Sequence, residues 1–301
     1  MSGRRLVLSW PEGEAFGQRL ARALGCDHAV VATRRFPDHE TYLRLPPSLA
    51  GTEVVLNCTL ADPDPKLAPL LFAADTARDL GAARVGLVAP YLAYMRQDRR
   101  FEAGEAITSR SFARVLSASV DWLVTADPHL HRFASLDELY PIPSSVVRAA
   151  PLLAGWICEN VERPLLLGPD AESRQWVAQA AATMGAPFAV LEKTRRGDRE
   201  VELVLPDLTA HRGLTPVLID DVAASGHTLI EAARLLAEAG FAQPCCAVTH
   251  ALFAGDAFEK LRTVTADIVS TDSIPHPTNR IELAPAFAAA VCAMLADRQK
   301  P

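Results

Sequence analysis

The feature that most constrains this chain is residues 217–236. Three aliphatic residues, Val217 to Ile219, lead into two acids, Asp220 and Asp221, and a short loop of small residues follows. The aliphatic run predicts a strand that is covered on both faces, as in a parallel sheet. Apolar residues then recur at helical spacing from Leu229 to Leu236, which predicts a helix. The loop therefore lies where open α/β sheets bind ligands, at the carboxyl end of a strand and the start of a helix.

The residue types in this loop favour a phosphorylated ligand. Backbone N–H groups at a helix start hold phosphate, helped by the helix dipole. Two adjacent carboxylates just before such a loop suit sugar hydroxyls, or a magnesium ion shared with the phosphate. Hydroxyl groups at Ser225 and Thr228 strengthen this interpretation. The alternative is an ordinary strand–loop–helix in which the acids cap the helix.

Length and composition exclude several classes of protein. A chain of 301 residues can form one large or two ordinary domains, and 50% hydrophobic residues suffice for a sizeable core. The net charge of −6 argues against a general nucleic-acid binder. Six scattered cysteines without a CxxC pair indicate free thiols in a reducing compartment. The amino terminus is too poor in apolar residues for a signal peptide, and no run approaches a membrane span. These features predict a cytoplasmic protein without membrane or nucleic-acid partners.

Strand-like and helix-like runs alternate along the chain in a βαβ rhythm, which repeats after a proline-rich turn at 140–143. The predicted strands are Arg5–Ser9, Ala29–Ala32, Glu53–Asn57, Arg84–Val88, Trp122–Thr125, Leu165–Leu167, Phe188–Leu191, Glu200–Val204, Val217–Ile219, Cys245–Thr249 and Asp267–Ser270. The predicted helices are Glu12–Leu24, Lys66–Leu80, Ser109–Leu116, Glu172–Met184, Leu229–Leu236, Ala257–Leu261 and Ala284–Ala296. The sequence therefore predicts an α/β protein of two similar halves, each with a mostly parallel sheet flanked by helices.

Four other charged segments accompany the predicted strands. They are residues 34–42, 90–101, 127–131 with 168–170, and 192–201. Three arginines beside a glutamine in the second segment suit a polyphosphate and an adenine edge, because guanidinium groups bind phosphate as a fork. His-x-His at 129–131 suggests a transition-metal site, but no third ligand has suitable spacing. For each segment the alternative is a solvated surface loop.

Taken together, these segments resemble one family. Residues 217–228 resemble the phosphoribosyl-diphosphate (PRPP) loop of type I phosphoribosyltransferases and of ribose-phosphate pyrophosphokinases (PRPP synthetases). The patterns RF-x-D-x-E from Arg35, PY-x-x-Y-x-RQDRR from Pro90 and K-x-R from Lys193 are similar to those of the pyrophosphokinases, and residues 102–110 resemble the archaeal-type version. This resemblance implies two phosphoribosyltransferase-like domains, at 1–146 and 147–283, with a last helix at about 284–299 that packs on the first domain.

The resemblance also implies roles for individual residues. The ribose 5-phosphate site would be Asp220, Asp221, Ser225, Gly226, His227 and Thr228. The ATP site would be Phe36, Asp38, Glu40, Arg96, Gln97, Asp98 and Arg99. Magnesium (Mg2+) would lie beside His129 and Asp170, the catalytic cations would be Lys193 and Arg195, and His131 would have no assigned role. Ala224, His227 and Glu172–Arg174 depart from the family pattern.

The implied activity is transfer of the pyrophosphoryl group of Mg-ATP, bound between the halves, to the C1 hydroxyl of ribose 5-phosphate, which gives PRPP and AMP. In relatives the loop equivalent to Phe36–Glu40 reaches into a neighbour's ATP site, so a homo-oligomer (a dimer or a hexamer of dimers) is expected. Two alternatives stay open. One is a phosphoribosyltransferase that consumes PRPP, and the other is a catalytically silent, PRPP-synthetase-like regulatory subunit.

Overall fold

The computed structural model describes residues 4–130, 132–196 and 200–297, with the side chains of these residues except 193–202 and 297. The chain forms two compact units. The first contains the described residues up to Val147 together with those from Leu283 onward, and the second is Arg148–Glu282.

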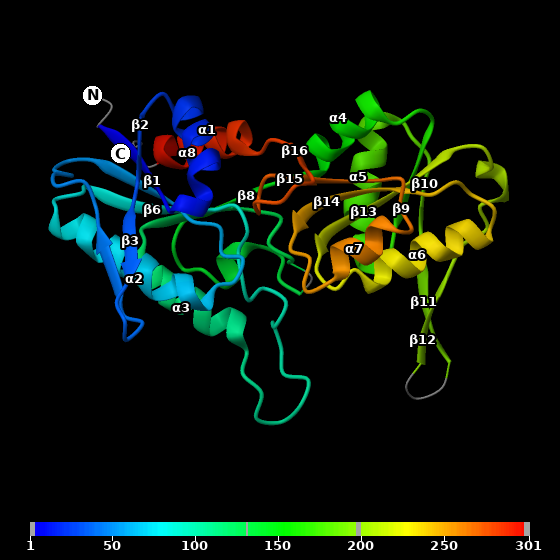
Figure 1. The fold of residues 1–301 in the computed structure, drawn as a ribbon, viewed down its shortest axis with the longest axis horizontal. Helices are drawn as coiled ribbons and strands as arrows, with labels where there is room; N and C mark the ends of the chain where they lie inside the picture. Colours follow the sequence, from blue (N-terminus) through cyan, green and yellow to red (C-terminus); the bar gives the residue numbers. More distant parts are fainter. Residues whose placement is uncertain (1–3, 131, 197–199, 298–301) are drawn as a thin grey trace. The chain divides into compact units, whose positions relative to one another are not determined.

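The first unit is built on a six-stranded parallel sheet with helices on both faces. Its strand order is β2-β1-β5-β6-β7-β8. Helices α1 and α8 cover one face of the sheet and α2 and α3 cover the other (Figure 1). The strands are β1 (Arg5–Ser9), β2 (Asp27–Val30), β5 (Glu53–Asn57), β6 (Arg84–Ala89), β7 (Trp122–Ala126) and β8 (Ser144–Val147). The helices are α1 (Glu14–Leu24), α2 (Asp64–Asp79), α3 (Thr108–Ser119) and α8 (Ala284–Asp297).

The second unit repeats this arrangement. Its parallel sheet has the order β10-β9-β13-β14-β15-β16, with α4 and α5 on one face and α6 and α7 on the other (Figure 1). The strands are β9 (Pro164–Gly168), β10 (Phe188–Val190), β13 (Thr215–Ala223), β14 (Cys245–Ala251), β15 (Asp267–Thr271) and β16 (Asn279–Ile281). The helices are α4 (Ala150–Asn160), α5 (Arg174–Met184), α6 (His227–Glu238) and α7 (Ala257–Arg262).

Aliphatic strands explain why both sheets are covered on both faces. In β13, Leu218 packs in the core beside α6, whereas Val217 and Ile219 pack in the core beside α4 and α5. A strand buried on both sides has no polar alternation, so it reads as a continuous apolar run. This agrees with the strand expected from the same residues.

Each unit also carries an antiparallel hairpin between its second and third sheet strands. In the first unit the hairpin pairs β3 (Ala32–Arg35) with β4 (Thr41–Arg44). In the second it pairs β11 (Glu192–Arg196) with β12 (Glu200–Val204). The equal placement of the two hairpins extends the internal repeat beyond the sheets.

One helix of each unit follows the last strand of the other. Helix α4 follows β8 in sequence but belongs to the second unit, where it packs beside α5. Helix α8 follows β16 but belongs to the first unit, where it packs beside α1 and β8. The rings of Phe16 on α1 and Phe287 on α8 meet edge-on, with centroids 5.5 Å apart. Each unit is thus completed by the helix that follows the last strand of the other unit in the sequence.

Several expected elements differ from the observed ones. Strand β13 extends past Ile219 to Ala223 because its pairing with β14 continues to Ala251, so the two acids lie within the strand. Helix α1 begins at Glu14 after a 3-10 turn at Pro11–Gly13. The elements β3, β4, β8, β11, β16 and α4 were not expected.

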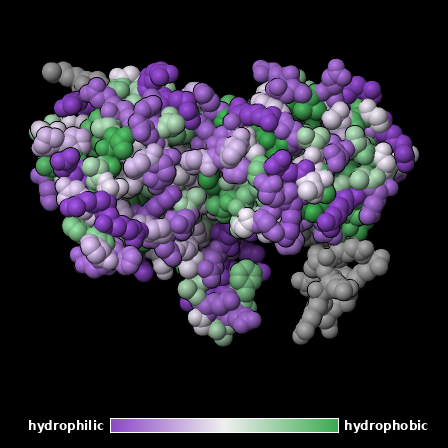
Figure 2. Space-filling model, viewed as in Figure 1, coloured by the Kyte–Doolittle hydropathy of each residue, from purple (hydrophilic) through white to green (hydrophobic). Residues whose placement is uncertain are grey.

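Hydrophobic side chains on the visible surface are scattered among hydrophilic ones (Figure 2). Among the described residues, no helix is both long enough and apolar enough to span a membrane.

Candidate active site

The loop between β13 and α6 of the second unit, which the sequence indicates as a ligand site, is short. Strand β13 ends at Ala223 and α6 begins at His227. Gly226 precedes the helix with φ of +70°, a conformation that glycine adopts without strain. None of the described side chains caps α6, so its first N–H groups are left for solvent or an anion. Ser225 and His227 are exposed, so the imidazole does not fill the loop.

Three carboxylates gather at the carboxyl edge of this sheet. Asp220 lies on β13, next to Asp221, and its Oδ1 accepts a hydrogen bond from the Asp221 N–H at 2.9 Å. Asp170 follows β9, the neighbouring strand in the sheet. Burial raises the pKa of Asp220 well above its ordinary value, and the charges of Asp221 and then Asp170 raise it further. The edge therefore concentrates negative charge that a cation or hydroxyl donors would stabilise.

Asp170 also organises its own loop. Its Oδ1 accepts hydrogen bonds from the N–H groups of Glu172 and Ser173, at 3.1 and 3.2 Å, and the Ser173 hydroxyl reaches back to Asp170. Asp170 is therefore the cap of a 3-10 turn at Ala171–Ser173. The residues that depart from the family pattern are accommodated by this capping box, which holds Asp170 in place.

The donors suit magnesium only with help from a substrate. Within the described part of the chain, no group of three His, Cys, Asp or Glu side chains is arranged to hold a metal ion. Magnesium takes oxygen ligands and is commonly held by one or two carboxylates together with substrate phosphates. The carboxylates at the sheet edge fit that mode of binding.

In the first unit, the loops after β6 and β7 leave the same edge of the sheet because the strands are parallel neighbours. An ion pair of 3.4 Å between Asp98 and Arg132 joins the two loops. His129 follows β7 with φ of +52°. Gln97 is also engaged, since its Oε1 accepts a hydrogen bond from the Thr108 hydroxyl at 2.9 Å.

Arg96 and Arg99 in the loop after β6 are both exposed, whereas Asp98 and Gln97 contact other residues of the protein. The Arg99 guanidinium lies 4.6 Å from the centre of the Phe101 ring. Both side chains are therefore accessible to an anionic ligand.

The tip of the β3–β4 hairpin carries the third predicted group. Phe36 is 39% exposed and meets Tyr42 edge-on, with centroids 6.3 Å apart. The Arg34 guanidinium lies 4.9 Å from the centre of the Phe36 ring. Asp38 accepts a hydrogen bond from the Glu40 N–H at 3.2 Å, which shapes the turn. The hairpin and the β6 loop project from the unit as separate extensions (Figure 1).

The predicted catalytic pair lies on a strand and not in a loop. Lys193 and Arg195 belong to β11, where they pair with Leu203 and Val201 of β12. The two residues are two positions apart on the same strand. Their side chains lie outside the described residues, as does all of His131.

Two residues near the predicted sites were not assigned from the sequence. Arg132 holds Asp98 and Arg34 contacts the rings of the hairpin. Arg34 stood within the charged segment but outside the expected pattern. No sequence signal linked Arg132 to Asp98, because their contact joins loops from different strands.

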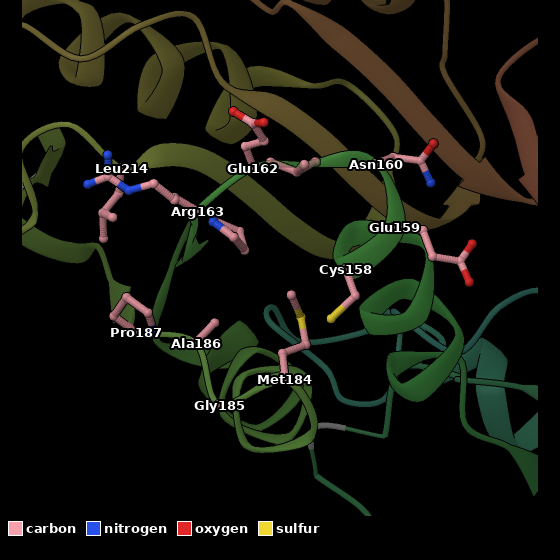
Figure 3. A pocket seen from close by; sticks show the side chains of 12 residues that line it. Cys158, Glu159, Asn160, Glu162, Arg163, Met184, Gly185, Ala186, Pro187 and Leu214 are labelled. Carbon is pink, nitrogen blue, oxygen red and sulfur yellow. The ribbon is translucent and has the colours of Figure 1, made fainter.

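The structure also contains cavities near and far from these edges. One of about 280 Å³, lined by Trp10, Arg34 and Lys66 among others, lies beside the β3–β4 hairpin. A larger one of about 610 Å³ lies at the amino ends of β9 and β10, where Cys158 and Met184 face one another (Figure 3). It is at the edge of the sheet opposite to Asp170 and Asp220, so it does not belong to the candidate site.

Comparison with known proteins places the whole chain in one family. Residues 6–119 match the N-terminal domain of ribose phosphate pyrophosphokinase, and residues 135–285 match the phosphoribosyl transferase domain. A ribose-phosphate pyrophosphokinase of Methanopyrus kandleri is 38% identical over 95% of this chain and 98% of its own. One of Saccharolobus solfataricus is 34% identical over 89% of this chain and 93% of its own.

A solved structure supports the fold. Phosphoribosylpyrophosphate synthetase from Mycobacterium smegmatis has a TM-score of 0.84 with 24% identity, and the match covers 98% of this chain and 99% of that one. The family matches span both units, including the repeated sheet and the loop before α6. The chain therefore belongs to the ribose-phosphate pyrophosphokinase family.

Proposed function

We propose that this chain is a ribose-phosphate diphosphokinase, which transfers the pyrophosphoryl group of Mg-ATP to the C1 hydroxyl of ribose 5-phosphate and releases AMP and PRPP. The observation that carries the proposal is the arrangement at the end of β13, where two acids precede an uncapped helix start. That arrangement offers carboxylates to a sugar and N–H groups to its phosphate within a few residues.

In this proposal ribose 5-phosphate binds to the second unit. The 5-phosphate accepts hydrogen bonds from the first N–H groups of α6, assisted by the hydroxyls of Ser225 and Thr228. Asp220 and Asp221 accept hydrogen bonds from the ribose hydroxyls. These bonds favour the charged form of Asp220, whose pKa is raised by burial in the free protein.

ATP uses residues of the first unit. Phe36 stacks on the adenine ring, and Asp38 and Glu40 accept hydrogen bonds from the adenine amino group. The side chains assigned to the β6 loop serve the rest of the nucleotide, and they are Arg96, Gln97, Asp98 and Arg99. The exposure of Phe36, Arg96 and Arg99 supports this assignment.

Magnesium, held beside His129 and Asp170 together with the phosphates, would neutralise negative charge on the transferring group. The carboxyl-rich edge of the second unit supports a place for such a cation. The chain's own part is to position the reacting groups, because this kind of transfer needs alignment and charge neutralisation more than covalent help.

Lys193 and Arg195 supply positive charge from the hairpin of the second unit. Charge that builds on the pyrophosphoryl group is stabilised more in the transition state than in the ground state. Their positions two residues apart on β11 support a joint role.

The test is an assay of purified protein with ATP, magnesium and ribose 5-phosphate, scored for both AMP and PRPP. Formation of the two products in equal amounts is expected, and Asp221→Asn is the matched loss-of-site control. No turnover at any phosphate concentration would refute the proposal and favour a regulatory subunit. We also propose a homo-oligomer, and a monomer by light scattering with activity retained on dilution would contradict that part.

A further inference from the structure

The loop before α6 is held from outside by a second loop. Residues 252–254 follow β14, the strand that neighbours β13. The N–H groups of Leu252 and Phe253 donate hydrogen bonds to the Ala223 carbonyl at 3.1 and 2.8 Å, and the Ala254 N–H donates to the Ala224 carbonyl at 3.0 Å. These bonds occupy the carbonyls at the start of the loop. They therefore fix the direction in which the following N–H groups point.

The bracing loop has an unusual backbone at its centre. Phe253 has φ of +30°, a region that a bulky side chain rarely occupies because it is strained there. Such a conformation persists only where surrounding contacts hold it. The hydrogen bonds to β13 supply some of these contacts, and the Phe253 ring supplies others.

Three rings form a cluster that we call the aromatic buttress, defined as Phe253, Phe258 and His276. The ring centroid of Phe253 lies 4.9 Å from that of His276 and 5.4 Å from that of Phe258. The rings of Phe258 and His276 meet edge-on at 4.7 Å. The buttress joins three segments, namely the bracing loop, α7 and the segment between β15 and β16.

His276 is itself fixed from the opposite side. Its Nδ1 lies 2.8 Å from the Thr278 hydroxyl and accepts a hydrogen bond from the Thr278 N–H at 3.3 Å. The Thr278 hydroxyl also lies 2.7 Å from that of Ser270 at the end of β15. Because Nδ1 accepts from a backbone N–H, the ring is neutral with its proton on Nε2. Burial favours the same form, since it lowers the pKa of His276.

We propose that Phe253 and His276 are positioning residues for the ribose 5-phosphate loop, acting through ring contact that holds residues 252–254 against Ala223 and Ala224. This inference rests on the proposed function. Neither residue would touch the substrate, and loss of the buttress would let the phosphate-binding N–H groups move from their places. A misplacement of about 1 Å costs up to about 100-fold in such sites.

Two replacements of His276 separate the ring from its hydrogen bonds. His276→Asn places an acceptor near the position of Nδ1 but removes the ring, whereas His276→Phe keeps the ring and removes the acceptor. We expect His276→Asn to raise the KM for ribose 5-phosphate about tenfold and the KM for ATP less than twofold, and His276→Phe to stay near wild type. Phe253→Asn, which tolerates positive φ, should behave like His276→Asn.

A readout without turnover accompanies the kinetics. Hydrogen exchange of the amides of residues 225–229 should quicken in His276→Asn and Phe253→Asn in the absence of substrates. The control is Phe188→Leu, an exposed phenylalanine on the edge strand of the same unit, which should change neither measurement. Absence of turnover in the wild-type protein would refute the proposed function, and the exchange data would still test the buttress.

Three results would overturn the inference. One is an unchanged KM for ribose 5-phosphate and unchanged exchange in both asparagine variants. Another is loss in His276→Phe with normal behaviour of His276→Asn, because the hydrogen bonds and not the ring would then be responsible. The third is a lowered thermal midpoint with both KM values unaltered, which is the signature of a purely structural role.

Discussion

Asp220→Asn should make the protein more stable and a poorer enzyme at the same time. Asp220 is half-buried, and burial raises the pKa of its carboxyl, with the charges of Asp221 and then Asp170 raising it further. Because the folded-state pKa lies above the ordinary value of 3.8, the side chain's contribution to stability is present below that pH and is lost as pH rises through the raised pKa. At pH 8, far above that ordinary value, the carboxyl is ionised in the unfolded chain, so its environment in the folded protein opposes folding.

The substitution removes this charge and keeps the shape of the side chain. The Asn oxygen can still accept the hydrogen bond from the Asp221 N–H. Relief of a buried, poorly solvated polar group is worth about 1–3 kcal/mol, and about 2–4 °C per kcal/mol is typical of domains of this size. The thermal midpoint at pH 8 should thus rise by about 2–12 °C, and the gain should vanish at pH 3.5.

The effect on substrate use has the opposite sign. A charge-assisted hydrogen bond to a ribose hydroxyl is worth about 1.5–3 kcal/mol, so the KM for ribose 5-phosphate should rise about 10- to 150-fold. The KM for ATP should be unchanged, because its residues are assigned to the other unit.

The assay is thermal unfolding by circular dichroism without substrates at the two pH values, together with steady-state kinetics at pH 8. Asp207→Asn is the matched control, since Asp207 is exposed and hydrogen bonds from Thr209 lower its pKa. That variant should not gain stability at pH 8. A midpoint for Asp220→Asn at or below wild type would refute the account of the buried charge. A rise in the KM for ATP alone would show that the loop serves the other substrate.

The other predictions concern three parts of the proposed site. Lys193→Ala and Arg195→Ala should each lower kcat about 10²–10³-fold with little change in either KM. The double variant should lower kcat by less than the product of the two single effects, because both residues act on one charge. A kcat near that of the wild type in both single variants would refute the assignment. Gly226→Ala should lower the free energy of unfolding, measured by urea denaturation, by about 1–2 kcal/mol. Only the backbone at φ of +70° is strained, because the new Cβ meets nothing closer than 3.6 Å. A larger loss would mean a steric clash. Phe36→Ala should raise the KM for ATP about 2- to 12-fold, the worth of an aromatic stack, and an equal rise for ribose 5-phosphate would argue for a general loss of structure.

Strands such as β1 and β5 were predicted with their observed bounds because their aliphatic runs are buried on both faces. Helix α4 was missed for a related reason, since it is apolar nearly all round and shows no helical alternation. The β3–β4 hairpin has the pattern of a surface connection, because most of the residues from 32 to 44 are exposed. A short apolar run of about five residues predicts a strand that is buried on both faces, whereas the longer apolar run of α4 has no period that would identify it as a helix.

The candidate site could be predicted from the sequence where a single segment contains both the ligand-binding side chains and the strand–loop–helix pattern that positions them. The acids and small residues before α6 form such a segment. The bracing loop does not, because its hydrogen bonds run from Phe253 to Ala223 across thirty positions of the chain. The same holds for the ion pair between Asp98 and Arg132. Contacts between loops of neighbouring strands produce no periodic sequence pattern in either loop.

Helices α4 and α8 each pack in the unit that does not contain the strand before them. This arrangement limits the order in which the two units can fold during synthesis. The side chains of Phe16 and Leu20 are buried in the completed first unit, where Phe287 of α8 lies against Phe16. Until the residues from Ala284 onward leave the ribosome, that surface has no cover. The second unit already has α4 by then, and so it can close first. The first unit therefore cannot be completed before the second has been synthesised, unlike the common case in which the N-terminal domain folds first.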